Sequence, residues 1–223
     1  MTLNTEYPDA APATRPAGDI VSRTYRLLAA TVAVSAVAAY LGMGLPFAYQ
    51  HPFILMLLGF AALFAVIITG ARDRPIALPL VFVFTGLMGL SLGPAIAVTL
   101  QLANGPLIVA EATGGTAIVF VGLSLYAAAS KRDFSVMGGF LTTGLIIAIL
   151  SGIANIWLKI PALQLTVAAA ALLIFAGYTL IDTQRLLRGG ETRPVLIVVS
   201  LYLDVLNIFV ALLQLLTAFQ GRR

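Results

Sequence analysis

The sequence predicts an all-α membrane protein, a seven-transmembrane helical bundle with the seventh helix central. The first observation is composition: 60% of the 223 residues are hydrophobic and 10% are charged, with a mean hydropathy of +1.01. Soluble domains are about 45–50% apolar and about 25% charged, so too little polar surface exists here for a soluble fold. The second observation is a series of seven long apolar stretches, and the third is a polar stripe on the last of them.

Each apolar stretch is long enough to cross a bilayer, because a transmembrane helix needs about 20 predominantly apolar residues. The connections between them are short and rich in Pro, Gly, Asn and charged residues, as in Arg72-Asp73-Arg74-Pro75. The predicted spans are 27–47, 53–71, 76–100, 105–129, 134–156, 162–183 and 195–219. We therefore expect a disordered cytoplasmic N-terminal tail at 1–26, one seven-helix transmembrane domain at 27–219, and a short C-terminal tail at 220–223.

Lys and Arg divide unevenly between the two sides of the predicted bundle. One side carries ten: Arg15, Arg23, Arg26, Arg72, Arg74, Lys131, Arg132, Arg185, Arg188 and Arg193. The other side carries Lys159, Arg222 and Arg223. Because cytoplasmic loops are enriched in Lys and Arg, the N-terminus is predicted to be cytoplasmic. Arg222 and Arg223 oppose an external C-terminus, which leaves a re-entrant seventh segment as the alternative.

Several function classes receive no support from the residues. The chain has no cysteine, which excludes disulfides, thiolate metal sites and cysteine nucleophiles. It has none of the H-E-x-x-H, G-x-S-x-G, Walker or dinucleotide-binding signatures, so we expect neither an enzyme nor a resident cofactor. The basic residues lie beside apolar spans, which argues against nucleic acid as a partner. The absence of eukaryotic sorting signals favours a bacterial inner (plasma) membrane.

Three acidic residues fall inside predicted spans: Glu111, Asp182 and Asp204. An acid at the centre of a membrane helix costs about 2.5–3.5 kcal/mol to insert, so each needs a structural or functional reason. At 100° per residue, Asp204 lies within about 80° of Ser200, Asn207 and Gln214. Such a stripe would be unsatisfied against lipid and must face helices or a water-filled cavity, which is why we expect the seventh span to be central.

Asp182 and Asp204 flank one short connection, so contact between them is feasible. Two carboxylates that meet in a poorly solvated site cannot both ionise cheaply, and the pair would then share a proton and respond to pH. Fully deprotonated, the pair offers hard oxygen ligands that suit calcium. Tyr178 and Arg185 share the face of Asp182. The alternative is that Asp182 pairs with Arg185 or Arg72 and serves only to hold helices together.

Glu111 lies near the external end of the fourth span. It is a candidate for an outer cation entrance. It could equally extend to the membrane interface or form a hydrogen bond to another helix.

Three stretches resemble motifs of the Bax inhibitor-1 family, also called the transmembrane Bax inhibitor motif family. They are Ser130-Lys131-Arg132-Asp133-Phe134-Ser135, Tyr178 through Asp182-Thr183-Gln184, and Ser200 through Asp204 to Phe209. The resemblance implies a seven-helix fold with the last helix surrounded by the other six. It also implies a pH-sensitive calcium leak gated by two aspartates, which fall on Asp182 and Asp204. An arginine latches the pair in some relatives, with Arg72 the nearest candidate, and some relatives carry an acid near Glu111.

Our leading hypothesis is a pH-sensitive calcium leak channel, supported by a polar network of Arg72, Tyr178, Arg185, Ser200 and Asn207. Its partners would be the lipid bilayer, protons and calcium, the last as a permeant or bound ion. Some bacterial-type relatives are linked to a membrane-bound protease. The second hypothesis is therefore a membrane interaction protein that modulates a membrane protease or quality-control machinery, without transport. A proton-coupled transporter is weaker, since no inverted repeat or interrupted helix pair is evident.

Overall fold

The computed structural model describes residues 17–188 and 193–220, which form helices and connections with no β-strand among them. Seven helices are long and apolar enough to cross a membrane. They are α1 (Ala17–Met43), α3 (Pro52–Gly70), α4 (Ala77–Leu100), α5 (Gly105–Ala129), α6 (Gly138–Leu158), α7 (Pro161–Leu187) and α8 (Pro194–Gln220). Two short elements, α2 (Pro46–Gln50) and η1 (Ser135–Met137), lie in the connections. The prediction of an all-α, multi-pass membrane protein is confirmed.

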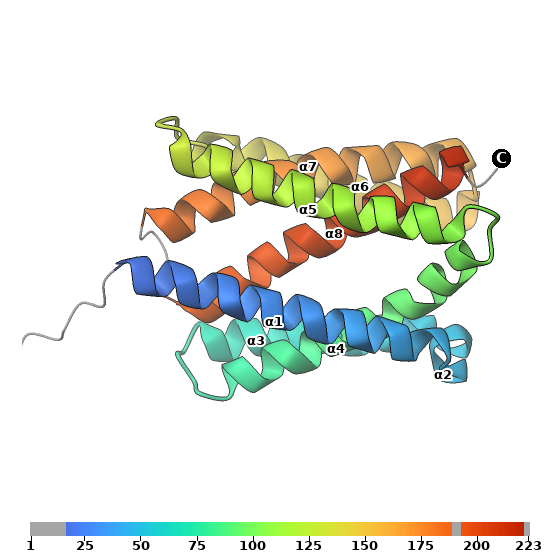
Figure 1. Ribbon diagram of the computed structural model, residues 1–223, viewed down its shortest axis with the longest axis horizontal. Helices are drawn as coiled ribbons and strands as arrows, with labels where there is room; N and C mark the ends of the chain where they lie inside the picture. The colour runs from blue at the N-terminus through green and yellow to red at the C-terminus, as the bar shows by residue number, and fades with distance from the viewer. Residues whose placement is uncertain (1–16, 189–192, 221–223) are drawn as a thin grey trace, which may run out of the picture.

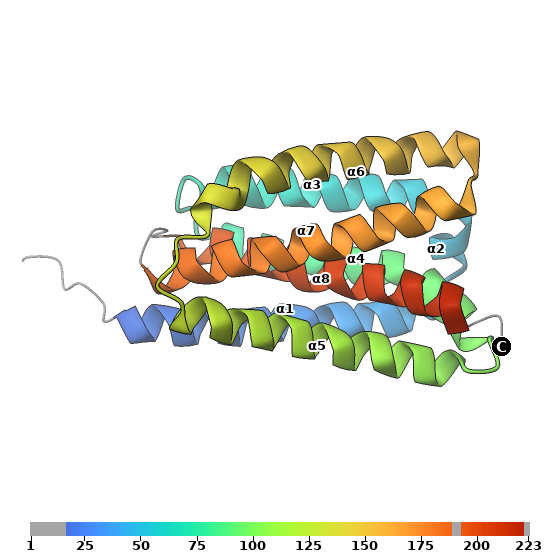
Figure 2. The same cartoon turned by 90° about the horizontal axis from the view of Figure 1, so that it is seen from above.

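The long helices form two groups with α8 between them. In Figure 1, α1, α3 and α4 lie on one side of the bundle and α5, α6 and α7 on the other, while α8 crosses obliquely from one group to the other. Figure 2 shows the same arrangement from above. Helix α8 packs against α1, α3, α4, α5 and α7, which confirms its central position. Helix α6 packs mainly on α7, so it stands at the periphery instead of sharing in a ring of six around α8.

The first helix begins earlier than the sequence predicts. Helix α1 starts at Ala17, whereas the first span was predicted from residue 27. After Pro16 no proline interrupts the chain until Pro46, and Thr24 and Leu28 are buried, so the polar residues near Asp19 and Arg23 continue a helix already packed on the bundle. The predicted tail at 1–26 therefore overlaps α1, and residues 1–16 lie outside the described part. Of the predicted C-terminal tail, Gln220 belongs to α8.

The described basic residues gather at one end of the bundle, which we call the basic end. The start of α1, the α3–α4 and α5–α6 connections, the end of α7 and the start of α8 all lie at the left of Figure 1. This end carries Arg23, Arg26, Arg72, Arg74, Lys131, Arg132, Arg185, Arg188 and Arg193. Within the described ranges, the opposite end carries Lys159 alone. That the basic end faces the cytoplasm stays a prediction.

Helices α1 and α4 approach each other closely through small residues. A Cβ added at Gly89 would collide with the backbone oxygen of Ser35, and one added at Gly93 would collide with the backbone of Gly42. Small residues at such positions let membrane helices pack backbone to backbone. At the same interface the Ser35 hydroxyl donates to Thr85 O at 2.7 Å. The contact therefore fixes how close α1 lies to α4.

We expect Gly93→Ala to destabilise the bundle by about 1–3 kcal/mol, because the added methyl group meets backbone that cannot rotate away. Thermal unfolding of the purified protein in detergent micelles measures the change. Gly114→Ala is the matched control, since a Cβ at Gly114 meets nothing within 4 Å. Equal unfolding temperatures for the two variants would contradict the close approach.

Candidate functional site

The two intramembrane aspartates are both buried in the part of the bundle where α7 and α8 pack together. Asp182 occupies the second-last turn of α7 and is 6% exposed. Asp204 lies in the third turn of α8 and is 2% exposed. The two carboxyl groups are close enough for the charge on Asp182 to act on Asp204. The short connection before Pro194 makes α7 and α8 antiparallel neighbours, which brings both residues to the basic end of the bundle.

Asp204 is incompletely satisfied. Among the described residues its Oδ2 atom is buried without a hydrogen-bond partner. The nearby hydroxyl of Thr179 donates to Phe175 O at 2.9 Å, so that donor is already in use. A buried polar atom without a partner is costly and points to strain or a chemical role. The free oxygen is a place where a proton or a cation could bind.

Asp182 has more partners than Asp204. Arg185 Nη1 lies 3.4 Å from Asp182 Oδ1, one turn further along α7, and the Arg185 side chain is 62% exposed. Ser200 of α8 is also within reach of the Asp182 carboxyl, although its hydroxyl donates to Leu196 O at 3.1 Å. Because the Arg185 side chain is largely exposed, this ion pair contributes about 0–1 kcal/mol. The sequence left two alternatives for Asp182, an ion pair with Arg185 or an interaction with Asp204. The structure has the ion pair, and it also places Asp182 at the interface with the helix that carries Asp204.

The remaining predicted members of the network point elsewhere. Tyr178 shares a hydrogen bond of 2.9 Å with the hydroxyl of Thr142 on α6. Asn207 donates to Leu203 O at 2.7 Å, within its own helix. Arg72 is exposed in the α3–α4 connection, and no ion pair found among the described residues joins it to either aspartate.

The polar stripe predicted for the last span is therefore only partly shielded. Ser200 and Asp204 lie at the α7 interface, whereas Gln214 is exposed. The expectation that the whole stripe faces inward is wrong for Gln214, because the neighbouring Ala211 and Leu213 take the buried face of this part of α8.

Glu111 lies at the end of the bundle opposite the basic end and is exposed. Its Oε2 atom accepts a hydrogen bond from Gln220 Nε2 at 2.7 Å, which joins α5 to α8. Of the alternatives considered for Glu111, the bond to another helix is the one present in the structure.

The end of α7 is anchored by residues that the sequence did not single out as site residues. The Gln184 side chain accepts from Phe134 N at 3.0 Å and donates to Arg132 O at 2.6 Å. Arg188 also donates to Arg132 O, at 2.9 Å. The Thr183 hydroxyl lies 3.2 Å from that of Ser124 on α5. Consecutive residues 182, 183 and 184 thus contact α8, α5 and the α5–α6 connection, which holds Asp182 in place.

Asp133 completes the same connection. Its Oδ1 atom accepts from Ser135 N at 3.0 Å and lies 3.9 Å from Arg188 Nη1. The hydrogen bonds from Ser135 lower the pKa of this exposed carboxyl group, so it stays charged at neutral pH.

The described residues contain no cluster of three or more His, Cys, Asp or Glu side chains that could hold a metal ion. Calcium takes about six to eight oxygen ligands, so the Asp182–Asp204 pair would need hydroxyl, backbone or water oxygens to complete a site.

Comparison with known proteins gives close relatives along most of the chain. A membrane protein of Vibrio cholerae is 39% identical over 197 residues, covering 88% of both chains. A protein of Campylobacter jejuni is 37% identical over 209 residues, covering 91% of this chain and 89% of its own. The Escherichia coli K12 protein named modulator of FtsH protease YccA is 36% identical over 197 residues, covering 88% of this chain and 89% of its own.

A family model described as inhibitor of apoptosis-promoting Bax1 matches residues 18–221. This range contains all seven transmembrane helices apart from Ala17, the first residue of α1. The match spans the aspartate pair and the anchored end of α7 together. This chain belongs to the Bax inhibitor-1 family.

Proposed function

We propose that this protein modulates a membrane-bound protease of the FtsH kind in the bacterial inner membrane, with its basic end in the cytoplasm. The observation that carries the proposal is the relative named as a modulator of FtsH protease, which aligns along 88% of this chain. An Escherichia coli O6 relative of the same identity is named an inner membrane protein. The alignment covers nearly the whole bundle, so the two chains share the same set of membrane helices.

The structure is compatible with a role that depends on contact. The described chain consists of membrane helices joined by short connections, so a partner would meet it within the bilayer or at the two ends of the bundle. The basic end presents a connection that Gln184 and Arg188 hold in one shape. Surfaces that are already ordered bind at a lower entropic cost than mobile ones. In this proposal the aspartate pair serves to position α7 against α8.

Reconstitution with FtsH protease in proteoliposomes tests the proposal. We expect the degradation rate of a membrane-protein substrate to change with the amount of this chain and then to saturate, because a bound modulator fills a limited number of sites. Asp204→Asn should retain the effect, since the amide keeps the shape of the carboxyl group. An unchanged rate at every ratio of folded chain to protease, with no cross-link between the two, would refute the modulator function.

A second candidate, the pH-sensitive calcium leak, is favoured by one specific observation. Asp204 carries a buried oxygen atom without a described partner, next to the second carboxyl group at Asp182. A site of this kind responds to protonation because two neighbouring negative charges repel in a poorly solvated environment. Deprotonated, the pair would attract a cation, and protonation would shift the packing of α7 on α8.

Calcium-dye flux in proteoliposomes tests the leak. Between about pH 6 and pH 8, flux through the unmodified protein should vary with pH, and Asp204→Asn should lose that variation because the amide does not titrate. Asp73→Asn is the matched control, since this acid is exposed in the α3–α4 connection, outside the α7–α8 interface, and should leave the pH profile unchanged. A leak with the same pH profile in Asp204→Asn would remove the pair from the mechanism.

A further inference from the structure

A long apolar groove opens between α1 and α5. Figures 1 and 2 show these two helices on the same side of α8, one from each helix group. The groove has a volume of about 720 Å³, with α1 and α5 as its walls and α4 and α8 at its base. On α1 it runs from Tyr25, near the basic end, to Met43 at the opposite end. All of these residues lie on membrane-spanning helices, so lipid reaches the opening from the side.

The lining is mostly apolar, and alanine residues make up part of its exposed wall. Ala29, Ala33 and Ala36 of α1 and Ala117 of α5 line the groove and are exposed. Its base is formed by Val205, Leu206 and Phe209 of α8. An open hollow of this kind does not stay empty in a membrane, because its walls would lose dispersion contacts.

The length and lining of the groove suit a hydrocarbon chain. From Tyr25 to Met43 the groove is about 27 Å long at 1.5 Å per residue, close to the thickness of a bilayer core of about 30 Å. A lipid acyl chain runs in the same direction as the membrane-spanning helices and is apolar along its whole length.

The positive charge of Arg26 favours a lipid with an anionic headgroup. Arg26 follows Tyr25 at the mouth of the groove and lies about 20° around the helix from Ala33, which lines it. Its Nε atom donates to Ser22 O at 3.4 Å, and no acidic side chain among the described residues forms an ion pair with it. The terminal nitrogens of this guanidinium group are the natural donors for a phosphate, which they can bind in a bidentate manner.

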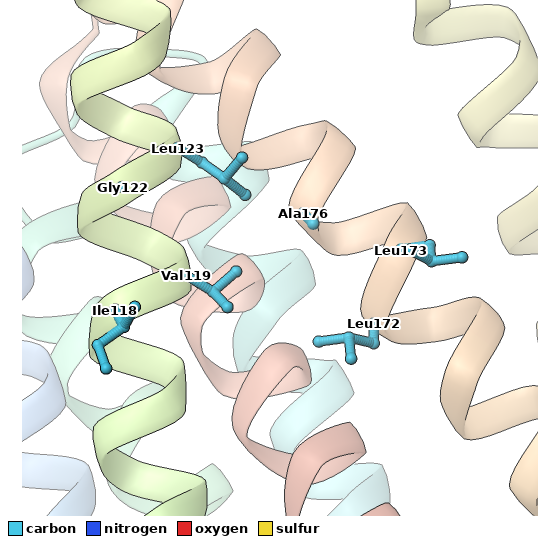
Figure 3. A pocket seen from close by; sticks show the side chains of 7 residues that line it. All are labelled: Ile118, Val119, Gly122, Leu123, Leu172, Leu173 and Ala176. Carbon is cyan, nitrogen blue, oxygen red and sulfur yellow. The ribbon is translucent and has the colours of Figure 1, made fainter.

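A second hollow offers a comparison. A pocket of about 400 Å³ lies between α5 and α7, where Val119 and Leu123 point toward α7 (Figure 3). On α5 it reaches only from Ile118 to Leu123, which is about 9 Å short of the end of the helix at Ala129. It therefore lies within the membrane interior, without a cation at its mouth.

We infer that the part of the α1–α5 groove nearest the basic end binds one acyl chain of an anionic phospholipid, whose phosphate contacts Arg26. The acyl chain covers the apolar face of α8 that the helices leave open. The site joins the two helix groups, because its walls come from one helix of each.

Native mass spectrometry of the full chain, titrated separately with phosphatidylglycerol and phosphatidylcholine, tests this site. The unmodified protein should bind the anionic lipid more tightly. Arg26→Gln should lower its affinity about fivefold, since one cation near an anionic lipid contributes about that much. The affinity for phosphatidylcholine should fall less, because the choline cation offsets the phosphate charge that Arg26 attracts. Ala33→Trp should weaken both lipids because the indole fills the groove. Val119→Trp, in the hollow of Figure 3, is the control and should change neither.

Three results would overturn the assignment. The first is an undiminished preference for phosphatidylglycerol in Arg26→Gln, a variant altered only at an exposed side chain and expected to fold. The second is equal loss of lipid from Ala33→Trp and Val119→Trp. The third is a disulfide-linked dimer formed by Ala33→Cys in membranes. The chain has no native cysteine, so such a dimer would mean that a second copy of the chain occupies the groove instead.

Discussion

A carboxyl group within a bilayer must find its partners inside the protein, and two such groups lie at the packing interface of α7 and α8. Asp182 and Asp204 are both buried there, and one oxygen of Asp204 has no described hydrogen-bond partner. Facing lipid would be more costly for either residue. The pair therefore requires α8 to lie inside the bundle and requires α7 to pack against it.

Helix α8 presents different residues to each neighbour, and this division connects the parts of the molecule. Asp204 faces α7, whereas Tyr202 forms a hydrogen bond of 2.5 Å with Ser35 of α1. Val205 and Phe209 form the base of the lipid-facing groove. At the other side of the pair, the end of α7 is tied to the α5–α6 connection through Gln184. A change in the protonation or packing of the aspartates would therefore alter the α5–α6 connection at the basic end. This holds for both proposed functions, contact with a protease and passage of a cation.

The number of spans and the central helix were predictable because both follow from the cost of placing polar groups in hydrocarbon. The nearness of Asp182 to Asp204 was foreseeable from one short connection between two helices. The start of α1 at Ala17 was not, because burial of Thr24 against other helices leaves no local signal. Gln184 was missed as a site residue for a similar reason: its partners are backbone atoms about fifty residues earlier in the chain. The hydropathy of the sequence likewise does not predict the α1–α5 groove, because the shape of the groove depends on how α8 crosses the bundle.

The central claim is that the Asp182 and Asp204 side chains interact directly, and a double-mutant cycle on unfolding free energy tests it. Asp182→Asn, Asp204→Asn and the double variant would be unfolded in detergent micelles at neutral pH. We predict that the two single effects depart from additivity by more than about 0.5 kcal/mol, as expected for groups in contact. Asp182→Asn combined with Glu111→Gln should be additive, because these residues lie at opposite ends of the bundle. Additivity of the two aspartate substitutions within about 0.5 kcal/mol would contradict the account.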